Sequence, residues 1–102
     1  MSEVLESVSA EALQARIDLA SGPDVPKLYM NGFLATMTGG DVACVLECNG
    51  KPVAMLNMSF TIAKSLSLSL GTVIANLESR SDRVILTANE LEKLLAAESE
   101  KK

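Results

Sequence analysis

The sequence has no histidine, and aromatic residues make up only 3% of its 102 residues. Without histidine the chain has no Ser-His or Cys-His pair that could activate a nucleophile. With so few aromatic side chains, a core must be built from Leu, Val, Ile, Met and Ala, and 48% of the residues are hydrophobic. This length fits one small domain, which buries only about two-thirds of its unfolded surface. An apolar-rich chain this short often completes its burial in an oligomer.

Other catalytic and metal-binding patterns are missing as well. Thr38-Gly39-Gly40 lacks the lysine and the following helix that a phosphate-binding loop needs. Asp41 and Glu47 are single acids, for which a solvated position is expected. On one strand Cys44 and Cys48 would lie about 13 Å apart, too far for a mutual disulfide. The sequence therefore predicts no catalytic residue, no metal site and no cofactor, and we expect a protein that is not an enzyme.

The charge and the absence of targeting segments bear on location. The sequence shows no secretory signal and no long apolar run, which predicts a cytoplasmic protein with two reduced thiols and no membrane span. The net charge is −4, which opposes non-specific binding to nucleic acid or anionic lipid. Most acids lie toward the two ends, and between Tyr29 and Leu77 the only charged residues are Asp41, Glu47, Lys51 and Lys64.

The N-terminal part predicts a helical arm. Apolar residues recur at helical spacing, and Ser9 is a suitable N-cap, so a helix is expected over residues 9–20. The segment SGPDVP at 21–26 breaks the pattern. We therefore expect an arm over residues 1–22 and a single α+β domain over residues 23–102.

Three strands follow the break. They are expected at 27–37, with a bulge at Asn31-Gly32, at 42–48 and at 51–58, joined by TGGD and by the Asn49-Gly50 turn that favours a tight hairpin. The result would be a three-stranded antiparallel meander. The second and third strands carry apolar residues on both faces, so both faces are expected to contact another part of the protein.

The segment KSLSLSLG at 64–71 alternates like a strand, but its surroundings have a longer period. Ser59 is a plausible N-cap and no proline interrupts, so a helix is expected over 59–78, packed on one face of the sheet. Leu68 is expected on the side of this helix that faces away from the sheet. It is either a single exposed leucine or a contact for a second subunit. The apolar stripe expected to face the sheet is Ile62, Leu66, Leu70, Val73 and Leu77.

The C-terminal part predicts a final short helix. RVIL at 83–86 reads as a short strand or an extended lead-in. Thr87 and Glu90 have the spacing of a capping box, and an amphipathic helix is expected to about residue 97.

Two runs carry a family resemblance: YMNG at 29–32 and NGKPVAMLNMSFTIAK at 49–64. Over roughly residues 28–78 the chain resembles an uncharacterised bacterial family of short proteins, in which a small meander precedes a helix that begins at M-S-x-x-x-A-K. It is more weakly similar to single-strand binders of the Whirly and purine-rich-element type, which place a long helix after a curved meander. This chain departs from them because it has three strands before the helix and few basic or aromatic groove residues.

The expected function is that of a non-enzymatic, homo-oligomeric interaction or accessory protein, with a dimer favoured, which binds another protein through apolar surface. One alternative is single-stranded nucleic-acid binding along the sheet, and another is carriage of a small apolar ligand between subunits. The candidate interface residues are Leu68, Thr72, Ala75, Val4, Leu5, Val8, Leu13 and Ile17. The candidate contacts for nucleic acid are Lys27, Tyr29, Phe33 and Lys51.

Overall fold

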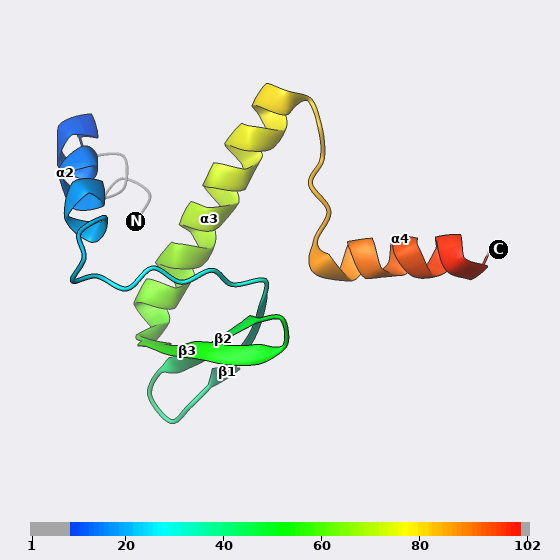
Figure 1. Ribbon diagram of the computed structural model, residues 1–102, viewed down its shortest axis with the longest axis horizontal. Helices are drawn as coiled ribbons and strands as arrows, with labels where there is room; N and C mark the ends of the chain where they lie inside the picture. Colours follow the sequence, from blue (N-terminus) through cyan, green and yellow to red (C-terminus); the bar gives the residue numbers. More distant parts are fainter. Residues whose placement is uncertain (1–8, 101–102) are drawn as a thin grey trace. The chain divides into compact units, whose positions relative to one another are not determined.

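The computed structural model describes residues 9–100, with side chains described over 9–98. The elements in chain order are α2 (Ala10–Ala20), β1 (Gly32–Met37), β2 (Val42–Cys48), β3 (Lys51–Met58), α3 (Phe60–Ser81) and α4 (Ala88–Glu100) (Figure 1). The chain divides into two units, Met1–Ser69 and Leu70–Lys102, which are described separately below. The mixed α+β class, with a meander followed by a long helix and a C-terminal helix, confirms the fold predicted from the sequence.

The sheet is an antiparallel meander in the order β1-β2-β3. Its first turn is closed by the amide of Thr38, which donates to the carbonyl of Asp41 over 2.8 Å. Its second turn places Asn49 at φ 53° and Gly50 at φ 82°. These positive values at both central positions are those of the tight hairpin turn that Asn-Gly favours. The predicted hairpin is therefore confirmed.

Asn31 ties the start of β1 to this second turn. Its side-chain Nδ2 donates to Oδ1 of Asn49 over 2.9 Å, and its Oδ1 accepts from the main-chain amide of Asn49 over 2.8 Å. The amide of Asn31 also donates to the carbonyl of Glu47. The asparagines of the two Asn-Gly pairs are thus hydrogen-bonded to each other. Asn49 forms the turn, and the side chain of Asn31 stabilises it.

Two strand predictions need correction. β1 begins at Gly32 instead of residue 27, because residues 27–30 have no partner strand and Asn31 adds only its amide bond to Glu47. The bulge expected at Asn31-Gly32 is not there, and the register shift lies instead between β2 and β3, at Leu46 and Glu47. Glu47 is paired with Pro52, which has no N–H to offer the ladder, so the irregularity falls where the chain lacks a donor.

The helical reading of the serine-leucine segment is confirmed. The hydroxyl of Ser59 accepts from the amide of Ile62 over 3.2 Å and caps α3. The helix runs three residues beyond the predicted end, to Ser81, and Asp82 follows with φ 54°. The segment is helical because the 3.6-residue period of its apolar residues continues on both sides of the short serine-leucine alternation.

The second unit ends in α4, whose capping box is formed as predicted. The amide of Glu90 donates to Oγ1 of Thr87 over 3.2 Å, and the amide of Thr87 donates to Oε1 of Glu90 over 2.9 Å. Residues 83–87 are not a strand, so the extended lead-in is the correct alternative. Its position is fixed by Glu78, whose Oε2 accepts from the amide of Ile85 over 2.7 Å.

Burial is sparse in the described part of the chain. Within it, the hydrophobic core consists of Ala43 alone, at 7% exposure. No residue of α3 is buried, and the stripe expected to be its core face is exposed, with Leu66 at 42% and Leu70 at 56%. Leu66, which belongs to the same unit as the sheet, is therefore not buried against it as expected. The hydrophobic residues form helices and strands with the predicted periodicities, and most of the large ones are exposed in the described part of the chain.

Candidate interaction surface

The strand register sorts the sheet residues onto two faces. Residues directly opposite in an antiparallel ladder share a face, and successive residues along a strand alternate between faces. Three cross-strand rows on one face are Phe33–Leu46–Ala54, Ala35–Cys44–Leu56 and Met37–Val42–Met58. Every member is hydrophobic, and we call this set the apolar face.

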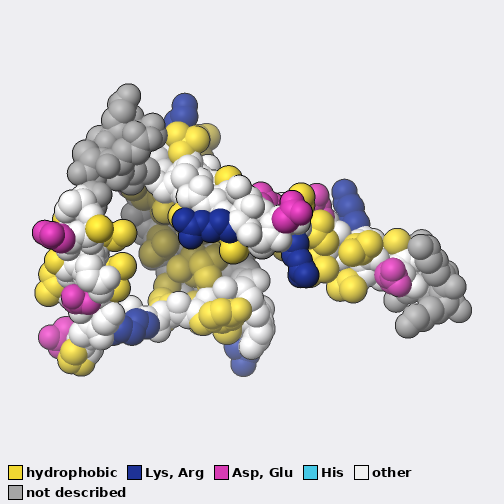
Figure 2. All heavy atoms as spheres, turned by 90° about the horizontal axis from the view of Figure 1, so that it is seen from above, with side chains coloured by type: hydrophobic (Ala, Val, Ile, Leu, Met, Phe, Trp, Pro, Cys, Tyr) yellow, Lys and Arg dark blue, Asp and Glu magenta, His cyan; other side chains and the backbone are white. Residues whose placement is uncertain are grey.

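The apolar face is open in the subunit. Phe33 is 61% exposed, Met37 75% and Leu56 42%. Its members on the central strand β2 are only half-buried. Hydrophobic side chains are also conspicuous on the surface drawn in Figure 2. Because monomeric soluble proteins rarely expose a large contiguous apolar patch, this face is a candidate interaction surface.

The opposite face is mixed in character. Its rows are Gly32–Glu47–Pro52, Leu34–Val45–Met55 and Thr36–Ala43–Asn57. Ala43 is buried here because its small side chain lies on the central strand between two cross-strand neighbours. The sequence predicted two apolar faces, and the register shows one that is uniformly apolar and one with a single apolar row.

The candidate interface residues on helices are exposed where they are described. Leu68 is 54% exposed, and Thr72 and Ala75 are exposed further along α3. Leu13 and Ile17 on α2 are 53% and 48% exposed. Val4, Leu5 and Val8 lie outside the described residues. Each helix therefore presents apolar side chains, but their exposure alone does not separate Leu68 from the stripe that contains Leu66.

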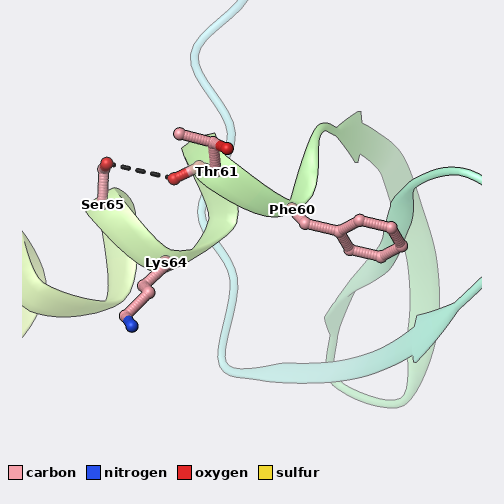
Figure 3. A pocket seen from close by; sticks show the side chains of 4 residues that line it. All are labelled: Phe60, Thr61, Lys64 and Ser65. Atoms are coloured by element: carbon pink, nitrogen blue, oxygen red, sulfur yellow. Dashed lines mark hydrogen bonds between the residues drawn. The ribbon is translucent and has the colours of Figure 1, made fainter.

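The clearest hollows lie on α3 and are open to solvent. One of about 260 Å³ is lined by Phe60, Thr61, Lys64 and Ser65, where the hydroxyl of Ser65 donates to the carbonyl of Thr61 over 3.0 Å and the side chain of Phe60 points away from that of Lys64 (Figure 3). Another of about 290 Å³ is lined by Val73, Asn76, Leu77 and Arg80. Phe60 lines the first hollow and Val73 and Leu77 line the second, together with polar and charged side chains.

The candidate contacts for nucleic acid are spread over the sheet and the segment before it. Phe33 and Lys51 lie on opposite edge strands of the sheet. Tyr29 precedes β1 and is 76% exposed. The ammonium of Lys27 is held by its own main chain, because Nζ donates to the carbonyls of Gly22 and Val25 over 2.6 and 3.0 Å.

The ionisable groups have few interactions. Over the described residues there is no group of three or more His, Cys, Asp or Glu side chains that could hold a metal ion. Cys44 and Cys48 are free thiols, half-buried on β2. At Glu90 the hydrogen bond from the Thr87 amide, with a further contribution from the Thr87 hydroxyl, lowers the pKa of the carboxyl below its ordinary value. That bond belongs to a helix cap.

α3 also bears on the predicted absence of a membrane span. Among the described residues it is the one helix long and apolar enough to cross a membrane by length and composition, a test that core helices of other proteins also pass. This single match is weak evidence, and the sequence did not predict it because polar residues divide the segment into short apolar runs.

Comparisons of the chain with protein-family models, with curated proteins and with solved structures found no match.

Sequence reasoning did not single out the residues that β1 contributes to the apolar face. Phe33, Ala35 and Met37 alternate along the strand, and this alternation was the available signal. Because Leu34 between them is apolar as well, the strand by itself does not define one apolar face.

Proposed function

We propose that the protein is a non-enzymatic, cytoplasmic, homo-oligomeric interaction protein whose apolar surface binds another protein chain. The observation that carries the proposal is the apolar face, three full rows without a polar side chain, in a subunit whose described part buries only Ala43. Burial of apolar surface is the main driving force for both folding and association. A subunit that leaves this face open gains most of its stability when a second surface covers it.

A second copy of the chain is the first partner to expect. Three strands with an apolar face need a packing partner for independent stability. Homodimers are also the commonest assemblies of soluble proteins. Binding of single-stranded nucleic acid has less support, since Phe33 and Lys51 lie on opposite edges of the sheet and the Lys27 ammonium is engaged by main-chain carbonyls.

The test is the mass of the full chain in solution, measured by light scattering. We expect the wild type to have at least twice the 10.8 kDa of one chain. Ala35→Asp places a charge in the middle row of the apolar face and should lower the mass to that of one chain or cause aggregation. Asn57→Asp places a charge on the mixed face and should leave the mass unchanged. A wild type that stays monomeric at every concentration measured would overturn the proposal.

A further inference from the structure

The two edges of the sheet differ in their protection. An edge strand exposes unpaired N–H and C=O groups, and proteins that must not pair through an edge place lysine, proline or a bulge there. β3 has all three devices, namely Lys51, Pro52 and the register shift opposite Glu47. The β3 edge is therefore closed to strand addition over this stretch.

β1 has none of these devices. Its sequence GFLATM contains no charge and no proline, and its pairing with β2 runs without interruption from Gly32 to Met37. Within the described part of the chain, β2 is the only strand that β1 pairs with. A six-residue edge strand this apolar and regular is a ready template for another strand.

We propose that two copies of the chain join through their β1 strands, which pair antiparallel around a twofold axis to form one six-stranded sheet. This inference rests on the proposed homo-oligomeric function and specifies its geometry. A β1–β1 contact is self-complementary and closes at two subunits. Pairing of β1 with β3 of another copy would instead continue without limit, and the protection of β3 opposes it.

The symmetry also decides what happens to the faces. A twofold axis that relates two antiparallel strands stands perpendicular to the sheet, so the same face of both copies points the same way. The two apolar faces then form one continuous surface across six strands, and the edge pairing leaves this surface open to the other protein chain that the proposed function requires. Directly opposite residues must share a face. This condition is met when Ala35 of one copy lies opposite Ala35 of the other, because residues on the apolar face are then opposite one another.

This register places the two most exposed members of the apolar face against each other. Phe33 of one copy lies opposite Met37 of the other, a sulfur–aromatic pair that covers side chains 61% and 75% exposed in the subunit. Thr36, on the mixed face, then lies diagonal to Thr36 of the other copy at about 7–8 Å, within reach of long side chains.

The first experiment changes charge at this diagonal. Thr36→Lys and Thr36→Glu place like charges across the interface and, at low ionic strength, should each lower the mass by light scattering to that of one chain, with the circular dichroism spectrum retained. Mixing the two variants should restore the dimer mass. Asn57→Lys is the matched control, because Asn57 shares a row with Thr36 but lies on the β3 edge, and it should remain a dimer.

The outcomes separate this inference from the proposed function. A wild-type monomer would overturn both. A wild-type oligomer that Ala35→Asp disrupts, but that either Thr36 variant leaves intact or Asn57→Lys disrupts equally, would overturn the β1 pairing alone. Failure of the mixture to restore the dimer would also overturn it.

A second measurement does not depend on the stability of the Thr36 variants. In a chain with Cys44→Ala and Cys48→Ala, Ala35→Cys should form a disulfide between copies under mild oxidation, because directly opposite residues lie about 4.5–5.5 Å apart between Cα atoms. Leu56→Cys in the same background lies in the same row on the other edge and should stay reduced. Equal cross-linking at both positions, or none at Ala35→Cys, would contradict the pairing.

Discussion

At the scale of single residues, Asn31 is the side chain with the most specific long-range role. Its amide group bonds twice to Asn49, which makes the positive-φ turn between β2 and β3. We expect Asn31→Ala to lower the free energy of unfolding by about 1 kcal/mol, because one side chain supplies two exposed hydrogen bonds of modest net value. Urea denaturation at fixed protein concentration measures the change. Asn57→Ala, an asparagine of the same sheet without a bond to the turn, should change it less, and an equal loss would contradict the role assigned to Asn31.

Glu90 gives the molecule a local pH dependence. Its pKa is lowered in the folded chain by the hydrogen bond from the Thr87 amide. The cap therefore contributes its stability at pH above the ordinary glutamate pKa, and this contribution is lost as the pH falls through the lowered value. We expect the helical circular dichroism signal to decrease over that acidic range.

Two substitutions distinguish the effect of Glu90 on the circular dichroism signal from the effect of acid on the rest of the protein. Glu90→Gln should remove this component of the decrease, since glutamine serves in a capping box without titrating. Glu92→Gln lies on the same helix, leaves the capping box intact and should keep the decrease. If both variants behave alike, the carboxylate of Glu90 is not responsible.

At the scale of elements, α3 contains leucines of the predicted apolar stripe and Leu68 outside it. Their exposed fractions do not distinguish them, since Leu66 is 42% exposed, Leu68 54% and Leu70 56%. Periodicity does distinguish them, because Leu66 and Leu70 belong to the stripe that an assembled protein would cover. We expect Leu66→Ala or Leu70→Ala to cost about 2–5 kcal/mol in the assembled state. Leu68→Ala should cost under about 1 kcal/mol. Denaturation at concentrations above the dissociation constant tests this, and equal losses at all three positions would refute the stripe.

Which elements the sequence could predict follows from where the signal lies. Ser59 and Thr87 predict the starts of two helices because their side chains can cap the first turn, and their hydrogen bonds confirm both positions. The start of β1 depends on a partner: residues 27–31 resemble a strand, but β2 ends at Cys48, where the Asn49-Gly50 turn begins, so residues 27–30 have no strand opposite them. The uniform character of the apolar face depends on register, which no single strand contains. Helix caps, turns and the order of the meander were therefore predictable, while the exact strand start, the register and the burial of side chains were not.

At the scale of the whole molecule, the N-terminal arm proposed over residues 1–22 should contribute to the covered surface. α2 presents Leu13 and Ile17, both about half exposed, so its apolar side has no cover within the described residues. Deleting residues 1–22 should expose apolar surface on the assembly and cause aggregation or a lower melting temperature, measured by light scattering during heating. Leu13→Ser combined with Ile17→Ser should reproduce the effect, and Arg16→Ser should not. A truncated chain as soluble and stable as the wild type would show that the arm is a solvated tail.

The two short turns of the meander have a consequence for the order of events during synthesis. β1 to β3 are consecutive, and their connections at residues 38–41 and at Asn49-Gly50 leave every sheet contact close in sequence. Closing such short loops costs little entropy, and proteins with local contacts fold quickly. The meander can therefore form on the ribosome before α3 has emerged. If β1 is the dimer edge, the new sheet stays monomeric until it meets a second chain. The rate of dimer formation then rises with the square of the monomer concentration.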